Sequence, residues 1–375
     1  MKIVELLASR HFTGPAERVL QTMRLLAERG HDVAFAHTRV PPGTLEAHTT
    51  DASFRVLSDV RLARKGLLLP GMLADAARLA ELAGRDTIVC HTHTSHDHWT
   101  GLMFRRRAAG RVVLVRSVHE SRQAARRIGD MPLFAACDGV IAISHAMRER
   151  LIESYRLDPE RCVVIPGAVD THAFRSGLAS DAIRAEIGAH EGDVLAGIVS
   201  RIKPGRGHRL LIEAFGEVLR EIPTVRLLIV GRGEGKAELE AFVATLPYRD
   251  RVHFLGYRRD DLADIYNTLD VSVLLGEGSD GTCRAALEAM ACGTPVIAAR
   301  VGSLPETIDD GATGALVDDG DATALASALS RYLGSPELAA THGRAARARV
   351  EREFALDAMA LAHEAFFAKL EEAGS

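Results

Sequence analysis

The sequence predicts an α/β protein with two doubly wound domains, in which parallel strands are joined by crossover helices. Three observations predict this fold class. Short apolar runs alternate with amphipathic stretches along most of the 375 residues. These runs form two separate series. Pro166 and Gly167 end the first series, and a polar stretch at 172–181 precedes the second, so a linker belongs near residues 168–190.

The first series predicts seven strands. Each is a short run rich in Val, Ile, Leu, Ala or Phe, which is typical of strands buried on both faces of a parallel sheet. The predicted strands span residues 2–8, 32–37, 54–57, 87–90, 112–118, 140–143 and 162–165. The stretches between them predict crossover helices, including residues 15–29 and 144–155.

The second series predicts six strands and a helical tail. The strands span residues 194–199, 226–230, 252–255, 271–275, 295–299 and 314–317. The helices between them fall near residues 207–220, 236–245, 260–268, 283–291 and 322–332. A helical stretch at 335–372 follows, and a tail of this size is expected to pack on the body of the protein.

The charge is balanced overall but uneven along the chain. With 46 basic and 50 acidic residues the net charge is −4, too balanced for a surface devoted to nucleic acid. Residues 1–170 carry 24 basic and 19 acidic residues, whereas the remainder carries 22 and 31. The basic half predicts contact with an anionic glycolipid or membrane surface, and a solvated helix face is the alternative.

Cysteine usage and hydropathy predict the compartment. The five cysteines form no CxxC pair, which favours a reduced setting. Glu5 interrupts the first apolar run, which is too short for a signal peptide, and no apolar stretch of about 18 residues occurs. We therefore expect a cytoplasmic protein, with peripheral attachment to the inner face of the cytoplasmic membrane as a further expectation.

Two motifs that resemble ligand-binding sequences are better interpreted as a turn and a helix cap. The segment GRGEGKA (231–237) lacks the spacing of a Walker loop and the Ser or Thr after its Lys, so it predicts a tight turn from a strand to a helix. The Asp319-Gly320-Asp321 motif has the spacing of a metal-binding DxD, but it opens a helical pattern and is better interpreted as a helix cap. Residues 8–18 follow the first predicted strand, where a dinucleotide-binding fingerprint requires three spaced glycines. Gly14 is the only glycine there, so this fingerprint is missing.

A histidine cluster defines an alternative function. Four histidines closely follow one predicted strand: His91, His93, His96 and His98. Histidines two residues apart at a strand end can share a divalent metal, so a zinc hydrolase with an HxHxDH motif is one hypothesis. Ser95 occupies the Asp position of that motif, however. We prefer a hydrogen-bonded loop or a role in a substrate cleft, and we predict no metal site.

The segment GSDGTCRAALEAMACGTP (278–295) carries the strongest chemical signal. A glycine-containing loop leaves a strand, and the helix that follows offers free N–H groups and a partial positive charge to a phosphate. Asp280 and Glu288 lie eight residues apart, about 12 Å if the segment is helical. These carboxylates would flank an anion site, one on a sugar and one on a ribose. A capping Asp and a solvated Glu are the alternative interpretation.

A second cationic turn is SRIKPGRGH (200–208). Arg201 and Arg206 are suited to clamping phosphate oxygens in a bidentate manner, and exposed loop cations are the alternative. Both this turn and the segment 278–295 follow strands of the same predicted sheet. We therefore expect them to converge on one edge of that sheet.

At this point the residues resemble a known family. Residues 199–306 resemble the family-4 retaining glycosyltransferases of the GT-B fold, whose pattern is R-x4-K-G, a glycine turn and E-x7-E. Arg201 matches the first Arg, and Arg206 stands at the Lys. Asp280 stands at the first Glu, a residue one methylene longer, and Glu288 matches the second.

The N-terminal half resembles the same family. The matching segments are TGPAER (13–18), RGHDV (29–33) and PGAVD (166–170), and His119 aligns with the family's cleft histidine. Pro15 replaces the second glycine of the first motif, which removes one N–H.

The resemblance implies a GT-B architecture with two Rossmann-like domains, an interdomain cleft and a C-terminal helical tail. Residues 1–170 would form the acceptor-binding domain and residues 171–190 the linker. Residues 191–352 would bind the nucleotide sugar, and the helix at 353–375 would pack back towards the N-terminal domain.

The resemblance also implies a hexosyl or related transferase that moves a sugar from a nucleotide-diphosphate sugar to a hydroxyl of a glycan or glycolipid, with retention of configuration. Cell-envelope polysaccharide or glycolipid biosynthesis would be its context, and no cofactor or metal would be required. The expected catalytic residues are His119, Asp280, Arg201 and Arg206. The expected donor-binding residues are Arg201, Arg206, Gly281, Thr282, Glu288 and Gly14. A nucleotide-sugar epimerase, a zinc hydrolase and an inactive nucleotide-sugar sensor are the alternatives.

Overall fold

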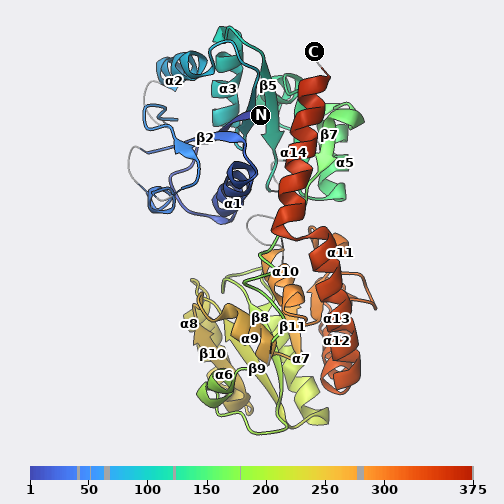
Figure 1. Ribbon diagram of the computed structural model, residues 1–375. Coiled ribbons are helices and arrows are strands. Elements are labelled where there is room, and N and C mark those ends of the chain that lie inside the picture. The colour runs from blue at the N-terminus through green and yellow to red at the C-terminus, as the bar shows by residue number, and fades with distance from the viewer. Residues whose placement is uncertain are drawn as a thin grey trace. The chain divides into compact units, whose positions relative to one another are not determined.

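The structure is a computed structural model that describes residues 1–39, 43–50, 52–62, 68–120, 124–177, 179–276 and 283–373. Its chain divides into two compact units. The first unit consists of Met1–Gly167 together with the C-terminal residues from Leu356 on. The second unit consists of the described residues between Ala168 and Ala355. Each unit is a parallel sheet covered by helices (Figure 1).

The first unit contains a seven-stranded parallel sheet with the order β3-β2-β1-β4-β5-β6-β7. Its strands are β1 (Lys2–Leu7), β2 (Asp32–His37), β3 (Arg55–Val56), β4 (Ile88–Thr92), β5 (Val112–Ser117), β6 (Gly139–Ala142) and β7 (Cys162–Val164). All seven strands predicted from the first series of apolar runs are confirmed. Every residue of β4 and β5 is buried, because helices cover both faces of the sheet.

The helices of the first unit are α1 (Gly14–Glu28), α2 (Leu68–Ala83), α3 (Ser95–Arg107), α4 (Met131–Ala135), α5 (His145–Tyr155) and α14 (Leu356–Glu372). Short 3-10 turns occur at Glu46–His48, Ile128–Asp130 and Pro159–Arg161. The helices predicted at 15–29 and 144–155 are confirmed as α1 and α5.

Helix α3 corrects the expected loop after β4. Thr94 caps this helix and accepts a hydrogen bond from the N–H of Asp97, whose carboxylate in turn accepts one from the N–H of Thr94. This reciprocal capping box satisfies backbone donors that would otherwise lack partners. The dense histidines masked the helical pattern, because its apolar stripe is weak and its buried positions include Asp97 and His98.

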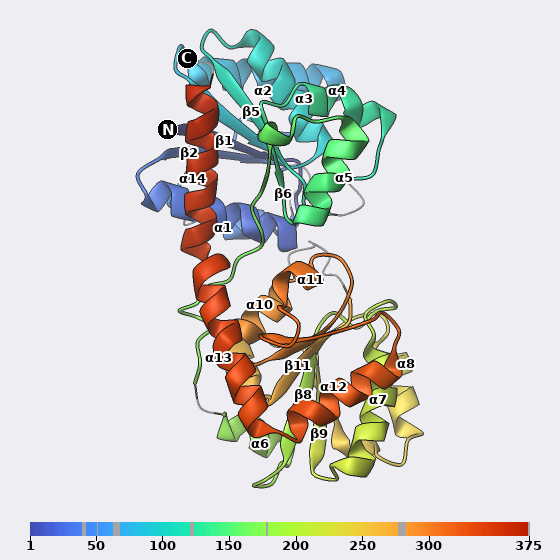
Figure 2. The same cartoon turned by 90° about the vertical axis from the view of Figure 1, so that its right-hand side faces the viewer.

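Helix α14 belongs to the first unit although it lies at the end of the chain. It packs along α1 (Figure 2), where Arg29 pairs with Glu364, and Phe366 and Leu370 near its end lie close to Gly139 at the start of β6. A side chain at Gly139 would come within 2.6 Å of Leu370 and 2.7 Å of Phe366. The glycine therefore permits the close approach of helix and strand.

The second unit contains a six-stranded parallel sheet with the order β10-β9-β8-β11-β12-β13. Its strands are β8 (Val194–Val199), β9 (Val225–Val230), β10 (Val252–Gly256), β11 (Val271–Leu274), β12 (Val296–Ala299) and β13 (Gly314–Val317). All six predicted strands are confirmed. Along β9, Leu227 and Ile229 join one core cluster, whereas Leu228 and Val230 join the other, so this sheet too is buried on both faces.

The helices of this unit are α6 (Asp181–Glu186), α7 (His208–Glu221), α8 (Lys236–Ala244), α9 (Leu262–Thr268), α10 (Arg284–Ala291), α11 (Leu304–Thr307), α12 (Ala322–Leu333) and α13 (Pro336–Glu353). A 3-10 turn lies at Arg249–Arg251. The five helices predicted between these strands are confirmed. Asp321 caps α12 by accepting a hydrogen bond from the N–H of Ala324 at 2.8 Å, as expected for the DxD motif.

The predicted tail at 335–372 is two helices rather than one. Helix α13 ends at Glu353 and α14 begins at Leu356, with Phe354 and Ala355 between them. The N–H of Val169 donates to the carbonyl of Phe354 at 2.9 Å, and Val169 forms a parallel bridge with Ala355. This pairing with a distant segment interrupts the helix, which is why periodicity alone did not reveal the break.

Gly343 tests how closely α13 packs against the backbone at Gly293. A Cβ atom there would lie 1.9 Å from the carbonyl oxygen of Gly293, which is backbone and cannot move away cheaply. We expect Gly343→Ala to lower the free energy of unfolding by about 1–3 kcal/mol despite the better helix propensity of Ala. Urea denaturation measures this change.

The matched control is Gly71→Ala on α2, where no atom lies within 4 Å of the added methyl group. This variant should be as stable as the parent or gain up to about 1 kcal/mol. Equal effects of the two substitutions would contradict the packing argument.

Candidate functional site

In the second unit, the loops of interest leave the carboxyl ends of β8 and β11. These strands are neighbours at the point where the strand order reverses, because β9 and β10 lie on one side of β8 and the later strands on the other. In open α/β sheets a ligand crevice forms at such a switch point. The segment 200–208 begins here, and Gly276, just after β11, is the last described residue before the segment 278–295.

Two glycines hold the β8 loop against the β9 loop. A Cβ atom at Gly231 would lie 1.9 Å from the carbonyl oxygen of Ser200, and one at Gly233 would lie 1.9 Å from that of Ile202. The N–H of Ile202 donates to the carbonyl of Arg232, and the carbonyl of Ile202 accepts from the N–H of Gly235, both at 3.1 Å. The expected tight turn at 231–237 therefore packs against the loop that carries Arg201 and supports it.

Arg201 and Arg206 have different surroundings. The side chain of Arg201 is largely exposed and lies 3.3 Å from the carboxylate of Glu234. Arg206 is only 8% exposed, and its Nη1 donates to the carbonyl of Gly276, which follows β11, at 3.5 Å. Arg206 is therefore not the exposed loop cation of the alternative interpretation, and its role at a phosphate stays a prediction.

Glu288 is also buried, at 7% exposure, in the middle of α10. Its Oε2 accepts a hydrogen bond from the hydroxyl of Tyr266 at 3.0 Å, and its Oε1 lies 3.5 Å from Nε of Arg284. Burial raises the pKa of Tyr266 well above its ordinary value, and the negative charge of Glu288 raises it further, so the phenol stays a donor. The interpretation of Glu288 as a solvated helix residue is therefore wrong.

The remaining donor-site residues of the sequence analysis are only partly placed. Asp280, Gly281 and Thr282 lie outside the described residues. Helix α10 begins at Arg284 after Cys283, whose φ is +51°, so the distance of about 12 Å that assumed a helix from residue 280 does not apply. Tyr266 was missed by the sequence analysis, because nothing near it in the chain signals a buried carboxylate.

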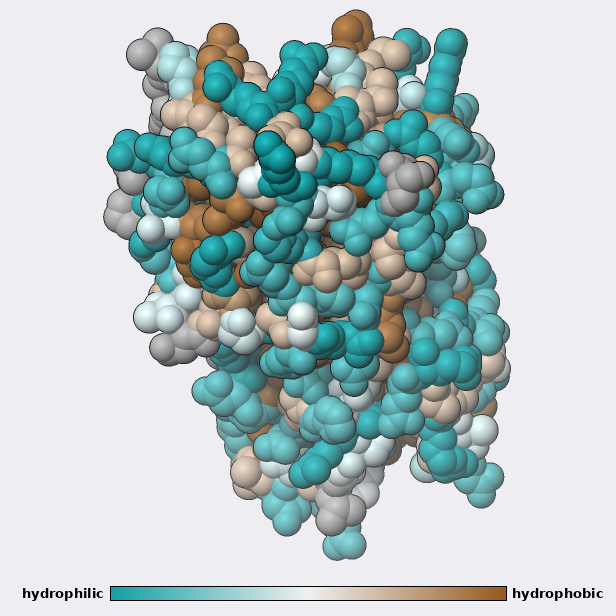
Figure 3. All heavy atoms as spheres, turned by 45° about the horizontal axis from the view of Figure 1, so that its top comes forward, coloured by the Kyte–Doolittle hydropathy of each residue, from teal (hydrophilic) through white to brown (hydrophobic). Residues whose placement is uncertain are grey.

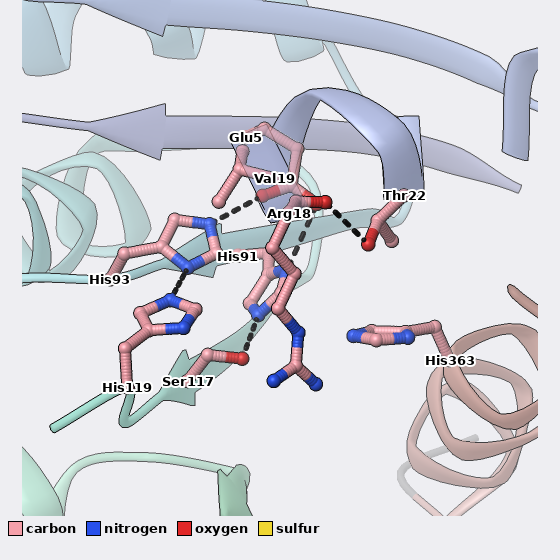
Figure 4. Close-up of a pocket in the computed structure, with 9 residues that line it drawn as sticks. All are labelled: Glu5, Arg18, Val19, Thr22, His91, His93, Ser117, His119 and His363. Carbon is pink, nitrogen blue, oxygen red and sulfur yellow. Dashed lines mark hydrogen bonds and ion pairs between the residues drawn. The ribbon is translucent and has the colours of Figure 1, made fainter. Parts of the chain in front are cut away.

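In the first unit, a buried cluster surrounds Glu5 (Figure 4). Glu5 on β1 lies opposite His91 on β4 in the sheet register, across the point where this strand order reverses. Its Oε1 is 2.8 Å from Nδ1 of His91, and its Oε2 is 2.8 Å from Nε2 of His93. Nδ1 of His93 is in turn 2.9 Å from Nε2 of His119.

The cluster encloses a cavity of about 10 Å³, the size of one water molecule. Besides the groups above, Figure 4 shows Arg18, Val19 and Thr22 from α1, Ser117 from β5 and His363 from α14 around this space. One guanidinium nitrogen of Arg18 donates to the carbonyl of Ile165 at 2.5 Å. Sequence analysis singled out His91, His93 and His119 but did not connect them with Glu5, although Glu5 inside an apolar strand was a usable signal.

The electrostatics of the cluster follow from its burial. Burial lowers the pKa of His119 well below 6.5, and the nearby His93 and Arg18 lower it further, so the ring is neutral at pH 7. Burial also lowers the pKa of His363 to about 3. Burial alone would raise the pKa of Glu5, but its interactions with His91 and His93 outweigh this effect and hold the pKa at about 2.

The structure does not gather the four histidines of the zinc-hydrolase alternative. His91 and His93 share Glu5, and the ligand atoms of these three residues lie within 4.8 Å of one another, already hydrogen-bonded. Nδ1 of His98 is instead 2.6 Å from the hydroxyl of Thr92, and its Nε2 is 3.1 Å from the carbonyl of Leu133. This alternative is therefore not supported.

Gly14 is the first residue of α1 and is half-buried. Thr13 precedes it with extended backbone, and Pro15 lies in the first turn, where a missing N–H costs nothing. Arg18 follows one turn later on the same helix. Gly14 itself does not line the cavity around Glu5.

The surface offers few large apolar groups. Hydrophilic side chains predominate on the face in Figure 3, with scattered apolar ones among them. In the first unit, Leu69 and Leu73 on α2, Trp99 on α3 and Ile128 are exposed among the described residues. Within the described part of the chain, no helix combines the length and the apolar character that crossing a membrane requires.

Two family descriptions match adjoining parts of the chain. "Glycosyltransferase Family 4" matches residues 12–173, and "Glycosyl transferases group 1" matches residues 179–349. The chain belongs to the glycosyltransferases. The two matches lie in the first and the second unit respectively, as the sequence resemblance implied.

Curated proteins with similar sequences are named D-inositol 3-phosphate glycosyltransferase. The one from Segniliparus rotundus is 35% identical over 232 residues, which are 60% of this chain and 51% of the relative. The one from Kineococcus radiotolerans is 36% identical over 243 residues, 60% of this chain and 56% of the relative. The chain thus spans about half the length of the curated relatives it matches.

Two solved structures with the same fold each cover 98% of this chain. Anabaena HepE in complex with UDP superposes with a TM-score of 0.81 at 21% identity, over 98% of this chain and all of that one. A glycosyltransferase from Rickettsia africae superposes with a TM-score of 0.83 at 18% identity, over 98% of each chain. At these identities the likeness concerns the fold, and it confirms the predicted GT-B architecture of two parallel sheets.

The energetic coupling between Tyr266 and Glu288 tests whether their hydrogen bond forms in the folded protein. A hydrogen bond to a buried carboxylate contributes about 1.5–3 kcal/mol, so Tyr266→Phe and Glu288→Gln should each lower the free energy of unfolding. In a double-mutant cycle measured by urea denaturation, we expect a coupling energy of about 1–2 kcal/mol.

The control cycle combines Glu288→Gln with Tyr332→Phe, a buried tyrosine that bonds to His342 instead. These two effects should add within about 0.5 kcal/mol. Additivity in the Tyr266 cycle as well would contradict the described contact.

His98 gives a pH test of the first unit. Burial, with a smaller contribution from the charge of Arg116, lowers the pKa of His98 to about 3. Below pH 6.5 the unfolded chain therefore binds a proton that the folded chain does not. Stability contributed by the neutral ring is therefore lost as the pH falls from 6.5 towards 3, with a slope of up to about 1.4 kcal/mol per pH unit.

We expect His98→Gln to reduce the pH dependence of the free energy of unfolding between pH 6 and pH 4 by about this slope. His145→Gln, at an exposed position on α5, is the control variant. An unaltered slope in His98→Gln would count against a neutral buried ring.

Proposed function

We propose that the protein is a glycosyltransferase that moves a sugar from a nucleotide-diphosphate sugar to an acceptor hydroxyl with retention of configuration. The observation that carries this proposal is the placement of Arg206 and Glu288. Both are buried charged residues: Arg206 donates to the carbonyl of Gly276 just after β11, and Glu288 lies on α10, the next described helix of the chain. Because the chain belongs to the glycosyltransferases, we interpret these two residues as part of a nucleotide-sugar site.

The donor belongs to the second unit in this proposal. The guanidinium of Arg206 and the N-terminal N–H groups of α10 would bind the diphosphate, since both present positive charge without a bound metal. Arg201 would be a further, exposed cation on the same loop. Glu288, fixed by Tyr266, would accept hydrogen bonds from the ribose. Asp280 would hold the transferred sugar, and Gly281 and Thr282 would contact the phosphates.

The acceptor belongs to the first unit. His119 is neutral there and would contact the sugar or the reacting hydroxyl, and Gly14 at the start of α1 would lie near the diphosphate. HepE binds UDP and UDP-glucose in its solved complexes, which favours UDP-sugars as first donors to test. The names of the curated relatives favour an inositol phosphate as the first acceptor, with glycans and glycolipids after it.

The chemical step needs charge stabilisation more than a nucleophile. The bond from C1 of the sugar to the diphosphate breaks through a state with oxocarbenium character, and negative charge develops on the leaving group. Arg206, Arg201 and the start of α10 would stabilise that charge. The acceptor hydroxyl enters on the face that the diphosphate leaves, which retains the configuration, and its proton passes to the leaving diphosphate. Membrane contact through the basic first unit, in glycolipid or polysaccharide synthesis, is part of the proposal.

The deciding experiment measures nucleoside diphosphate release from UDP-, GDP- and ADP-sugars with and without acceptors. We expect release that depends on an acceptor, a product with the anomeric configuration of the donor, and no loss of rate with EDTA. A sugar altered in the absence of acceptor would indicate an epimerase. Tight donor binding without release over the whole acceptor panel would refute the transferase.

Arg206→Ala should raise the donor KM and lower kcat together. Loss of one preorganised positive group at a developing anion lowers the rate about 10²–10³-fold, and kcat/KM should fall at least as far. Arg206→Lys keeps the charge and should recover part of the loss. Steady-state kinetics with the active donor measures both.

The matched control is Arg209→Ala on α7, whose guanidinium pairs with Glu213 at 3.0 Å on the exposed face. Its kinetics should be those of the parent. Melting temperatures distinguish misfolding from a lost contact, and full activity of a folded Arg206→Ala protein would remove Arg206 from the proposed site.

A further inference from the structure

We propose that the first unit docks on a lipid bilayer with anionic headgroups, through a surface that we call the docking rim. Its residues come from α2, α3 and the turn before α4: Leu69, Leu73, Trp99, Arg126, Arg127 and Ile128. The inference rests on the membrane contact in the proposed function and deepens it, because it names the surface and the kind of lipid.

Helices α2 and α3 lie side by side (Figures 1 and 2). Helix α2 joins β3 to β4 and α3 joins β4 to β5, and these strands are parallel, so the two helices run in the same direction. Leu69 and Leu73 lie in the first two turns of α2, and Trp99 lies in the second turn of α3. The three side chains therefore belong to the same end of this pair of helices.

The turn with Ile128 is fastened to that end as well. The hydroxyl of Ser95, the first residue of α3, donates to the carboxylate of Asp130 at 2.7 Å and so ties the 3-10 turn Ile128–Asp130 to the start of the helix. The side chain of Ile128 is 86% exposed. Single exposed apolar side chains are common, but four large ones gathered at one end of a helical layer indicate a contact surface.

The outer face of α2 lacks the polar side chains of a solvated helix. Its inner face carries Ala76, Leu79 and Ala83, which belong to the core of the first unit. The exposed residues that the structure describes in its first two turns are all apolar: Leu69, Pro70, Leu73 and Ala74. A helix that water covers normally has a polar outer face, so the start of α2 is suited to an apolar environment.

Guanidinium groups around the rim select an anionic partner. Arg126 and Arg127 are exposed next to Ile128, and Arg106 is exposed on α3, about two turns after Trp99. None of these three arginines forms an ion pair with a carboxylate among the described residues. On α2 and α3 the structure describes one exposed acidic residue, Glu81, near the far end of α2.

This combination of groups matches a bilayer of anionic lipid. Such a bilayer offers an apolar interior beneath a negatively charged surface, and proteins that lie on it combine Trp and Leu with Arg or Lys. A second copy of the chain fits the rim less well. In a symmetric pair the same patch meets itself, so the guanidinium groups of both copies would face one another and repel.

The test mixes the full chain with vesicles of phosphatidylglycerol and phosphatidylcholine in equal parts, and with vesicles of phosphatidylcholine alone. Trp99 is the only tryptophan of the chain, so its fluorescence reports directly on the rim. With the anionic vesicles we expect co-sedimentation, a blue shift of the Trp99 emission and quenching by brominated lipid, all reversed by high salt. Absence of binding at low salt, or binding that leaves the Trp99 emission unchanged, would overturn the proposal.

Variants locate the surface. Arg126→Gln with Arg127→Gln should lower the partition coefficient into anionic vesicles about 10–30-fold, because each basic residue near such a surface contributes about fivefold. Ile128→Ser should lower it about tenfold, because an apolar side chain that enters the bilayer is lost. These residues are exposed, so the melting temperatures of the variants should equal that of the parent.

The matched controls make the same kinds of change outside the rim. Leu361→Ser removes an exposed apolar side chain from α14, and Arg344→Gln with Arg352→Gln removes two exposed charges from α13. Both should bind vesicles as the parent does, and losses equal to those of the rim variants would refute the assignment. A dimer of the parent that Ile128→Ser dissociates, seen by sedimentation velocity, would assign the rim to a second copy instead and so overturn the proposal.

The readouts separate this inference from the proposed function. If no nucleotide sugar supports turnover with any acceptor, while the rim variants alone lose vesicle binding, the proposed function fails and the docking rim stands. If a nucleotide sugar is turned over with a dissolved acceptor and anionic vesicles do not bind, the inference fails and the transferase stands.

Discussion

The constraint on which the rest of this structure depends is that all strands of a parallel sheet end at the same edge. Loops that are far apart in sequence are therefore gathered wherever their strands are neighbours. In the second unit this places the loop with Arg206 beside Gly276, 70 residues later in the chain. In the first unit the same rule sets β1 beside β4 and so brings Glu5 next to His91.

Burial then decides what these gathered groups can do. A carboxylate inside a sheet or under a helix is tolerated only when donors surround it. Glu5 has two imidazoles, and Glu288 has the phenol of Tyr266 and the guanidinium of Arg284. These partners fix the orientation of each carboxylate.

Backbone packing supplies the precision that the loops need. Gly231 and Gly233 let the β9 loop touch the carbonyl groups of the β8 loop, a contact that any Cβ atom would prevent. Gly139 does the same for α14, which reaches the first sheet from the far end of the chain and contributes His363 to the cluster around Glu5. Each glycine thus serves a contact with a segment distant in sequence.

The sequence by itself determined the thirteen strands, most of their crossover helices, the two-unit organisation of the sheets and the loops that carry Arg201, Arg206 and Glu288. These features follow from local hydrophobic periodicity and turn residues, which each segment carries in its own residues. Helix α3 escaped prediction because histidines and an aspartate occupy its buried positions.

Only the tertiary structure decided the partners. It made Glu288 a buried residue held by Tyr266, separated the zinc-ligand candidates, broke the C-terminal tail at Ala355 and joined Glu5 to His93 across 88 residues. The physical reason is that a buried polar group is satisfied by whatever side chain the fold brings within about 3 Å, and sequence distance places no limit on that choice.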